Sequence, residues 1–392
     1  MILRRVAAYP AARVGYPADP VAFDGTVASW GKQMGWGSGS YVDRVVAERE
    51  VRLERISEDL DWGCAFTGIG LDEPEARTEE FHAVLADLIH RFQLVLFKRQ
   101  RLTPERHVEL ARKLCPHLGA KLPPTSAADN GFKPEDLVPG LPEIAVLGSK
   151  PFDDPSNYYG KPVNNSVKGV QWPLFGPCSW HCDGAAFETP GSFTFVHMPR
   201  APVKGQGGAT LYGSGYDVYD SLPEDLRQRA EKATIRYIED GAWEFEYDMK
   251  HNGMRRLNKP GQVETTWHHQ HRLVQTHPVT GRKAVWTAPA NVMAADDQDL
   301  VEAVLECGIK RTYAHFYDDG DVCISDDRAM LHSTTPFGPD AGARILHRCG
   351  TELRSLPNRR KSFQYLYNVP GSNLNGQMSF KPGHDLAPAQ IE

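Results

Sequence analysis

The sequence predicts a mainly β protein, a barrel or jelly roll, with helices packed against it. Short strand-like runs separated by turn residues fill the chain after Phe187, and clear helical periodicity is gathered mainly in the N-terminal third. The 35 glycines and 29 prolines supply many turns. With 392 residues, 41% hydrophobic and 24% charged, the chain has an ordinary globular composition and can bury a sizeable core.

The N-terminal third begins with an irregular arm, which is followed by two helices. Residues 1–54 mix proline, glycine and aromatic residues without periodicity, which indicates an arm rather than a domain. Apolar residues recur at helical spacing over 79–92, and the apolar run 93–97 predicts a buried strand directly after this helix. A second helix is expected to begin with Thr103 as its N-cap and to stop where Pro116 follows.

A long segment rich in proline, glycine, asparagine and serine precedes the β region. It covers about 121–180, and we expect a functional insert or lid there, because structureless connections of this length are uncommon in compact domains. A capping-box pattern at 221–224 predicts the start of a short helix. We expect one domain over 55–392. Its other elements are expected as strands at 192–196, 209–212, 234–238, 313–317, 322–325 and 344–353, and as a helix at 297–307 that ends at Gly308.

Charge, hydropathy and cysteine usage exclude several classes of protein. A net charge of -6 gives no basic footprint for nucleic acid. No apolar run approaches the roughly 18 residues that a membrane span needs. The seven cysteines are scattered without a C-x-x-C pair, which is typical of a reduced cytoplasmic protein. We therefore expect a cytoplasmic protein with a small-molecule substrate, no nucleic-acid or membrane partner, and a possible homo-oligomeric state.

Two histidines and one aspartate are the candidate metal ligands. His181 and Asp183 precede a β region, where residues two apart share a face and can converge on one ion. The similar pair His107 and Glu109 lies within the expected second helix, where residues two apart diverge. A facial Fe(II) site needs a second histidine from elsewhere, and His332 follows a later strand.

Two arginines follow the second histidine. Arg344 and Arg348 are four residues apart on an expected strand, so their side chains should project into the same interior. Buried guanidinium groups are costly unless they meet anions. The pattern leaves open whether Arg348 meets an acidic group of a substrate or an acid of the protein itself.

Five motifs in this order resemble the taurine dioxygenase-like family of Fe(II)/2-oxoglutarate-dependent oxygenases, which includes phenoxyacetate-degrading members. The resemblance covers roughly residues 55–355. An ordered set of five motifs is more specific than any one of them. The motifs are Trp180-His181-Cys182-Asp183-Gly184, Gly207-Gly208-Ala209-Thr210-Leu211, the segment from Thr276 to Lys283, Asp326-Asp327-Arg328 with His332, and Arg344-Ile345-Leu346-His347-Arg348.

The resemblance implies a double-stranded β-helix core that holds Fe(II), with 2-oxoglutarate as co-substrate and O2 as oxidant. It implies an oxygenase that oxidises a small, acidic organic substrate and releases succinate and CO2. By motif position, it implies His181, Asp183 and His332 as catalytic iron ligands, Thr210 and Arg344 as the residues that bind the distal carboxylate of 2-oxoglutarate, and Arg348 as the residue that holds an acidic group of the substrate.

The sequence departs from the family pattern around the site. Asp327 stands where members usually carry asparagine, and Ala209 where they usually carry an acid, so a taurine-like substrate does not follow from the resemblance. The segment 152–180 carries several aromatic residues and leads directly into the ligands. We expect Trp172 and Phe175 to contact an apolar substrate body from this lid; the alternative is a loop that only packs over the barrel.

Two other functions stay open at the level of the sequence. One is a non-catalytic jelly-roll protein that binds a metal or a small molecule, for which Thr210 and Arg344 would be incidental. The other is a zinc hydrolase built on the same barrel, which would work without oxygen. Formation of succinate from 2-oxoglutarate separates both from an oxygenase.

Overall fold

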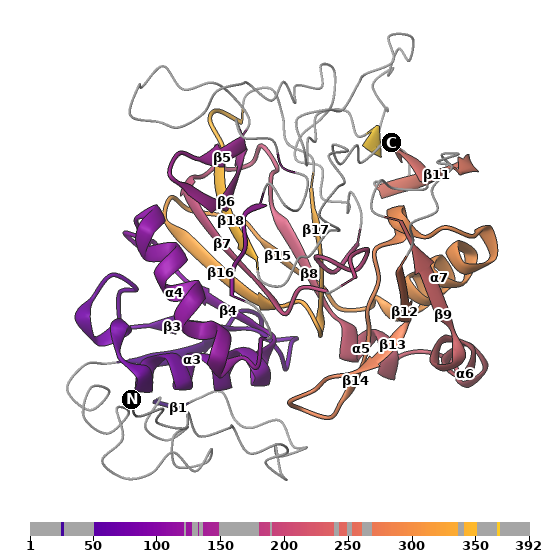
Figure 1. The fold of residues 1–392 in the computed structure, drawn as a ribbon, viewed down its shortest axis with the longest axis horizontal. Helices are drawn as coiled ribbons and strands as arrows, with labels where there is room; N and C mark the ends of the chain where they lie inside the picture. The colour runs from indigo at the N-terminus through magenta and orange to yellow at the C-terminus, as the bar shows by residue number, and fades with distance from the viewer. Residues whose placement is uncertain are drawn as a thin grey trace, which may run out of the picture.

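A nine-stranded sheet is the largest element of the structure, with the strand order β1-β2-β3-β4-β16-β7-β18-β6-β5 (Figure 1). The computed structural model describes residues 25–26, 51–120, 123–127, 132, 136–148, 180–188, 190–238, 243–248, 253–260, 269–335, 341–350 and 367–368. The strands of this sheet are β1 (Gly25–Thr26), β2 (Arg52–Arg55), β3 (Cys64–Thr67), β4 (Leu94–Phe97), β5 (Leu137–Val138), β6 (Leu141–Gly148), β7 (Phe193–Arg200), β16 (Asp321–Asp326) and β18 (Ile345–Gly350).

A three-stranded antiparallel sheet, β15-β8-β17, lies beside the large sheet (Figure 1). Its strands are β15 (Tyr313–His315), β8 (Thr210–Ser214) and β17 (Met330–Thr334). The remaining strands are β9 (Thr234–Tyr237), β10 (Trp243–Asp248), β11 (Gly253–Pro260), β12 (His269–Arg272), β13 (Val274–Thr276), β14 (Lys283–Val285) and β19 (Tyr367–Asn368). The described part of the chain is therefore mainly β, as the sequence predicts.

Helix α3 (Glu79–Phe92) has the bounds that its apolar periodicity predicts. The Thr78 hydroxyl accepts a hydrogen bond from the backbone N–H of Phe81 and caps the first turn. The helix ends at Gln93, which adopts a left-handed conformation with φ of 65°. Strand β4 follows at once and is buried along its whole length.

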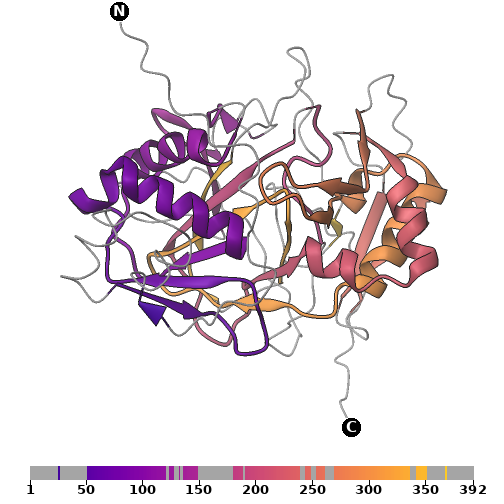
Figure 2. The ribbon, with the colours of Figure 1, turned by 90° about the horizontal axis from the view of Figure 1, so that it is seen from below.

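Helix α4 (Pro104–His117) begins with the Thr103 cap that the sequence predicts, but it ends later than expected. Pro116 lies inside the last turn instead of stopping the helix. A proline there removes only its own N–H, and the backbone N–H of Leu118 still donates to the carbonyl of Leu114 at 2.9 Å. Figure 2 shows α3 and α4 together at one side of the molecule.

Two further expectations about helix ends are wrong. The capping box at 221–224 does not form: Ser221 ends helix α5, and α6 begins after Pro223 without a side-chain cap. Gly308 is the last residue of α7 and not its cap, which is Ile309. The glycine is explained by packing, because a Cβ at this position would sit 2.3 Å from Val218 Cγ1. These helices are α5 (Gly215–Asp220), α6 (Glu224–Lys232) and α7 (Ala295–Gly308).

The main hydrophobic core lies between α3, α4 and the large sheet. Phe66 of β3 packs against Phe81 of α3 and Phe97 of β4, with ring centroids 6.0 and 5.3 Å apart. A second core around Trp286 joins α5, α6 and α7 to the strands at the other end of the molecule (Figure 2). The residues of the candidate site lie on or beside five strands between these two cores: β7, β16, β18, β8 and β17.

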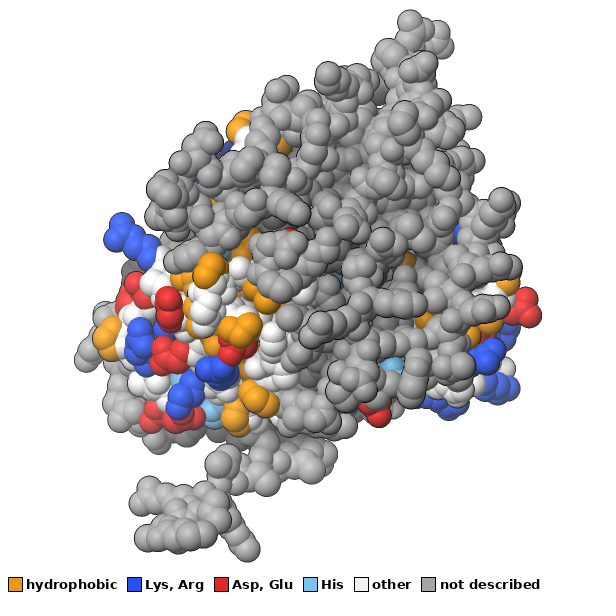
Figure 3. Space-filling view, turned by 45° about the horizontal axis from the view of Figure 1, so that its top comes forward, with side chains coloured by type: hydrophobic (Ala, Val, Ile, Leu, Met, Phe, Trp, Pro, Cys, Tyr) orange, Lys and Arg blue, Asp and Glu red, His pale blue; other side chains and the backbone are white. Residues whose placement is uncertain are grey.

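The described surface carries both signs of charge. Basic and acidic side chains intermingle at the lower left of Figure 3, on the side of the molecule that bears α3 and α4. Two of the ion pairs among them involve α4: Glu109 pairs with Arg77, which precedes α3, and Arg112 pairs with Glu143 of β6. Among the described residues, no helix has both the length and the apolar character that a bilayer crossing requires. Most of the expected arm, 1–54, and of the expected lid, 121–180, lies outside the described residues.

Candidate functional site

His181 and His332 are held side by side by their backbones. The N–H of His181 donates to the carbonyl of His332 at 2.9 Å, and the N–H of His332 donates to the carbonyl of His181 at 2.8 Å. On the other side of β17, His332 pairs in register with Tyr212 of β8. The two imidazole rings consequently lie close together, with their centroids 4.3 Å apart and their planes inclined by 50°.

Asp183 completes a group of three potential metal ligands. Its Oδ1 lies 3.6 Å from Nε2 of His181 and 3.6 Å from Nε2 of His332. One ligand atom from each residue lies within 4.8 Å of the others, as the sequence predicts. The expected cause differs, however: Asp183 lies in a turn after the His181 bridge, so the turn and not the alternation of a strand brings the carboxylate to the two rings.

The second oxygen of Asp183 is occupied by two donors from the large sheet. Oδ2 accepts hydrogen bonds from the Thr194 hydroxyl of β7 at 2.7 Å and from Arg348 Nε of β18 at 2.8 Å. Burial alone would raise the pKa of Asp183, but the charge of Arg348 and the neighbouring histidines hold that pKa well below its usual range. The carboxylate is therefore ionised, with Oδ1 turned toward the histidines.

Arg348 thus contacts an acid of the protein, one of the two possibilities that the sequence leaves open. Its Nη2 also lies 2.7 Å from Asp183 Oδ2, so two nitrogens of the guanidinium group meet the same oxygen. This contact fixes the carboxylate rotamer. Hydrogen bonds that orient a ligating carboxylate are a regular feature of metal sites.

His332 is in the protonation state that a metal ligand requires. Burial, with the neighbouring His181, lowers the pKa of His332 to about 3. Its imidazole is therefore neutral at physiological pH and can present a lone pair to a cation. A deprotonated carboxylate beside it, in a site that is largely buried, favours a divalent ion over a proton.

Thr210 and Arg344 come together around Tyr317, close to the strands that carry the triad. The Tyr317 hydroxyl donates to Thr210 Oγ1 at 2.9 Å, and Thr210 pairs in register with Thr334 at the end of β17. Arg344 precedes β18 and is buried, which lowers its pKa, while neighbouring Tyr317 opposes this change. The two residues expected to bind one carboxylate therefore lie around a common neighbour.

Asp327 also lies at the candidate site. The sequence marked it only as a departure from the family pattern. Its Oδ2 lies 2.7 Å from the same Thr194 hydroxyl that contacts Asp183. Complete burial and the charge of Asp183 raise the pKa of Asp327 well above its usual range, so this carboxyl group is neutral. A neutral carboxyl offers both a donor and an acceptor, like the amide of asparagine although with one N–H donor fewer, which is how an acid is accommodated at this position.

A second group of possible ligands, His90, His277 and Asp326, is better explained as a buried hydrogen-bond network. His277 Nδ1 accepts from the backbone N–H groups of Val279 and Thr280, so its Nε2 carries the proton and donates to Asp326 Oδ2 at 2.9 Å. The same carboxylate also accepts hydrogen bonds from two nitrogens of the Arg328 side chain and lies within hydrogen-bond distance of His90 Nδ1. Its acceptor positions are filled, and this network ties α3 to the turn after β16.

Other expected or missed residues complete the description. Trp172 and Phe175 lie outside the described residues. Thr194 and Tyr317 contact the site but had no signal in the sequence beyond their place in predicted strands. Cys182, between the two candidate ligands, is buried, and this burial raises the pKa of its thiol well above the usual range. The cysteine faces the second core and is no part of the triad.

Comparisons with known proteins identify the family of the chain. The family model described as "Taurine catabolism dioxygenase TauD, TfdA family" matches residues 54–349. Pentalenolactone F synthase of Streptomyces avermitilis is 28% identical over 41% of this chain and 56% of its own length. The (S)-phenoxypropionate/alpha-ketoglutarate-dioxygenase of Sphingobium herbicidovorans is 23% identical over 71% of this chain and 88% of its own.

A solved structure supports the same fold. The crystal structure of AAD-2 in complex with Mn(II) and N-oxalylglycine has a TM-score of 0.56 and 17% identity, and covers 77% of this chain and 97% of that one. The chain spans little more than half the length of the synthase named above. The family model, in contrast, matches well over half of the chain. The chain therefore belongs to the taurine catabolism dioxygenase TauD, TfdA family.

Proposed function

We propose that the chain is an Fe(II)- and 2-oxoglutarate-dependent oxygenase that uses O2 to oxidise a small organic acid, with succinate and CO2 as co-products. The observation that carries the proposal is the convergence of His181 Nε2, His332 Nε2 and Asp183 Oδ1. Two imidazoles and one carboxylate form the facial ligand set of non-haem Fe(II) oxygenases. We also propose that the nine-stranded and three-stranded sheets form a jelly-roll core within one domain over 55–392.

The residues present fit the metal in charge and in protonation state. His332 is neutral because it is buried, and Asp183 is ionised with one oxygen turned to the histidines. Bound Fe(II) would supply the redox chemistry that couples decarboxylation of 2-oxoglutarate to C–H oxidation of the second substrate. Thr194 and Arg348 would keep the other oxygen of Asp183 engaged, so that the carboxylate binds through one oxygen only.

Arg344 and Thr210 would bind the distal carboxylate of 2-oxoglutarate. A guanidinium group can donate two parallel hydrogen bonds to a carboxylate, and such a pair is strong in a buried site. Thr210 Oγ1 accepts from the Tyr317 hydroxyl, so its own hydrogen is directed elsewhere and can be donated to the co-substrate. Tyr317 would therefore position Thr210 rather than contact the co-substrate itself.

We propose an acidic substrate with an apolar body. Arg348 is the expected partner of its acidic group, and the residue would then divide its donors between the substrate and Asp183. Trp172 and Phe175, in the expected lid, would contact the apolar body. The relative that acts on phenoxypropionate, a carboxylic acid with an aromatic ring, supports this class of substrate.

The test is an anaerobic titration of the purified chain with Fe(II) and then 2-oxoglutarate. The 2-oxoglutarate chelate should give a weak visible charge-transfer band, and admission of oxygen should release succinate. His181→Ala should lose the band, whereas His269→Gln, a histidine of β12 outside the site, should keep it. Iron binding and turnover that survive His181→Ala would refute the assignment. Metal binding without succinate in any condition would favour the non-catalytic alternative.

A further inference from the structure

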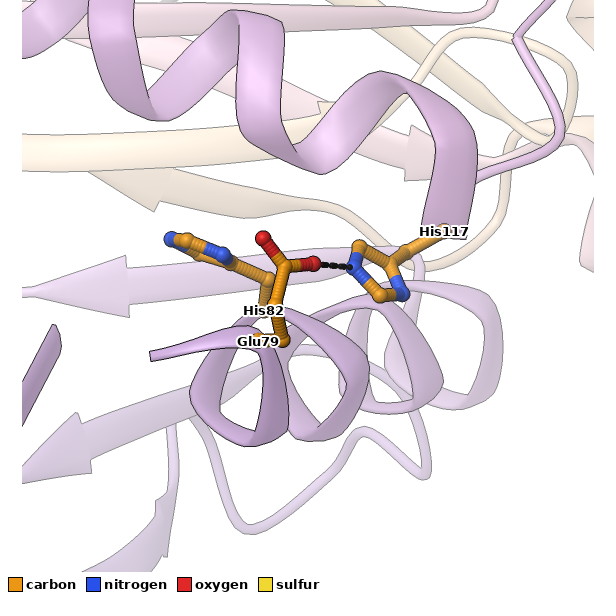
Figure 4. A group of neighbouring side chains, drawn as sticks. All are labelled: Glu79, His82 and His117. Carbon is orange, nitrogen blue, oxygen red and sulfur yellow. Dashed lines mark hydrogen bonds and ion pairs between the residues drawn. The ribbon is translucent and has the colours of Figure 1, made fainter. Parts of the chain in front are cut away.

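A second cluster of potential metal ligands lies on the helical side of the molecule and shares no residue with the triad. Glu79 and His82 lie in the first turn of α3, and His117 is the last residue of α4. Figure 4 shows the carboxylate of Glu79 between the two imidazole rings. The cluster therefore joins the start of one helix to the end of the other.

The geometry of the cluster is close to that of a bound divalent cation. Residues three apart on a helix project from the same face, which places Glu79 beside His82. One ligand atom from each of the three residues lies within 4.8 Å of the others, and His117 Nε2 is 3.0 Å from Glu79 Oε2. Ligands of a tetrahedral zinc ion lie about 3.3 Å apart, given metal–ligand distances near 2.0–2.1 Å. Small side-chain rotations would close the difference.

The surroundings of His82 indicate that the cluster binds an ion. His82 is only 1% exposed, and neither of its ring nitrogens has a hydrogen-bond partner among the described residues. Buried polar atoms without partners are rare and need an explanation, such as an ion. Burial lowers the pKa of His82 to about 4, so the ring is neutral and keeps a lone pair for a cation.

We propose that Glu79, His82 and His117 form a second metal site that binds a zinc-like divalent cation, with water as the fourth ligand. Two imidazoles and one carboxylate are a ligand set that Zn2+ accepts readily. The bound ion would replace the present hydrogen bond between His117 Nε2 and Glu79 Oε2 with a bond to each of these atoms. Lys113 Nζ, 3.4 Å from Glu79 Oε1, opposes the incoming cation.

The ion would act as a clamp between two helices. Helices α3 and α4 cover the large sheet, and their cores are continuous with it. A cation that ligates residues from both helices binds the folded state in preference to the unfolded one, and so raises the melting temperature with its concentration. Because the active-site triad is made of other residues, this effect does not depend on the proposed oxidation reaction.

The test is zinc stoichiometry, measured by equilibrium dialysis on the full chain without an affinity tag. The triad also offers a zinc site, so the wild-type chain should bind two ions and His117→Asn and Glu79→Gln one ion each. Both substitutions are at partly or largely exposed positions, which protects the fold. His117→Cys supplies a thiolate in place of the imidazole and should restore the second ion. Lys113→Ala should bind it about twofold to fivefold more tightly.

The active-site ligands are removed in a complementary experiment. His181→Ala combined with Asp183→Ala should leave one ion per chain, and Co2+ bound to this variant should show the visible bands of a tetrahedral complex. The zinc-dependent rise in melting temperature should persist in this variant and disappear when His117→Asn is added. Equal zinc stoichiometry in wild type and His117→Asn, or no ion bound to the variant that lacks the triad ligands, would overturn the proposal.

Discussion

Two buried histidines in the centre of the large sheet should make the protein sensitive to mild acid. His197 of β7 and His347 of β18 are paired in register, with ring centroids 6.0 Å apart, and are 4% and 3% exposed. Burial lowers the pKa of His197 to about 4 and that of His347 to about 3; Asp321 favours the charged form of His197, but burial outweighs it. Buried His107 meets His197 edge to face, and burial also lowers the pKa of His107 well below the usual value.

The sign and size of the effect follow from these pKa values. The folded state binds fewer protons than the unfolded state, so the stabilisation is complete above the unfolded pKa of about 6.5 and is lost as the pH falls toward the folded pKa. At pH 4.5, two units below the unfolded value, each histidine costs about 2.6 kcal/mol of stability. Two histidines together remove about 5 kcal/mol, which is comparable with the whole stability of many domains.

Urea unfolding at pH 7.5, 5.5 and 4.5 measures this loss. In His197→Gln the buried ring is replaced by a side chain that does not titrate, so the free energy of unfolding should fall by about 2.6 kcal/mol less between pH 7.5 and 4.5 than in wild type. The quantity to compare is the pH dependence of the free energy of unfolding, not the absolute stability of the variant. His269→Gln on β12 is the matched control and should retain the wild-type dependence. A dependence in His197→Gln equal to that of wild type would refute the reasoning.

Other substitutions test the site and the packing around it. Arg344→Lys keeps the charge but loses the bidentate fork, so the KM for 2-oxoglutarate should rise about tenfold, and an unchanged KM would place the anchor elsewhere. Arg348→Lys should weaken iron binding in a dialysis assay if the residue mainly holds Asp183; a raised substrate KM with unchanged iron affinity would instead mark a substrate anchor. Asp326→Asn leaves donors of its buried network without an anion and should cost about 3 kcal/mol in urea unfolding, while a loss below about 1 kcal/mol would contradict the network.

Local signals in the sequence predicted the helices well and their ends less well. The start of α3 follows from a Thr78 cap and an apolar stripe, both of which are local. The end of α4 depends on which backbone bonds survive around Pro116, and Gly308 is explained only by its contact with Val218 from another helix. Element ends are decided by such tertiary contacts, which a pattern along the chain does not contain.

Residue type and motif order identify the candidate ligands in the sequence. The contacts that support these ligands could not be predicted in this way. The sequence left open whether Arg348 meets a substrate or an acid of the protein, and the pairing of β18 with β7 places it on Asp183 beside Thr194. Likewise, Asp327 is neutral because of its burial next to another acid, which depends on where two distant turns meet. Register between strands far apart in sequence is the information that the pattern lacked.

The reciprocal backbone bonds between His181 and His332 also bear on how the protein folds. Roughly 150 residues separate the two histidines, so a large loop must close before they meet, and closing it costs conformational entropy. Contacts of such high sequence separation are typical of slowly folding β topologies. The three ligands therefore cannot converge in a partly folded chain that lacks this strand pairing. Iron uptake would follow the completion of the two sheets rather than guide it, and the rate at which refolding chains acquire metal would report the closure of this one long loop.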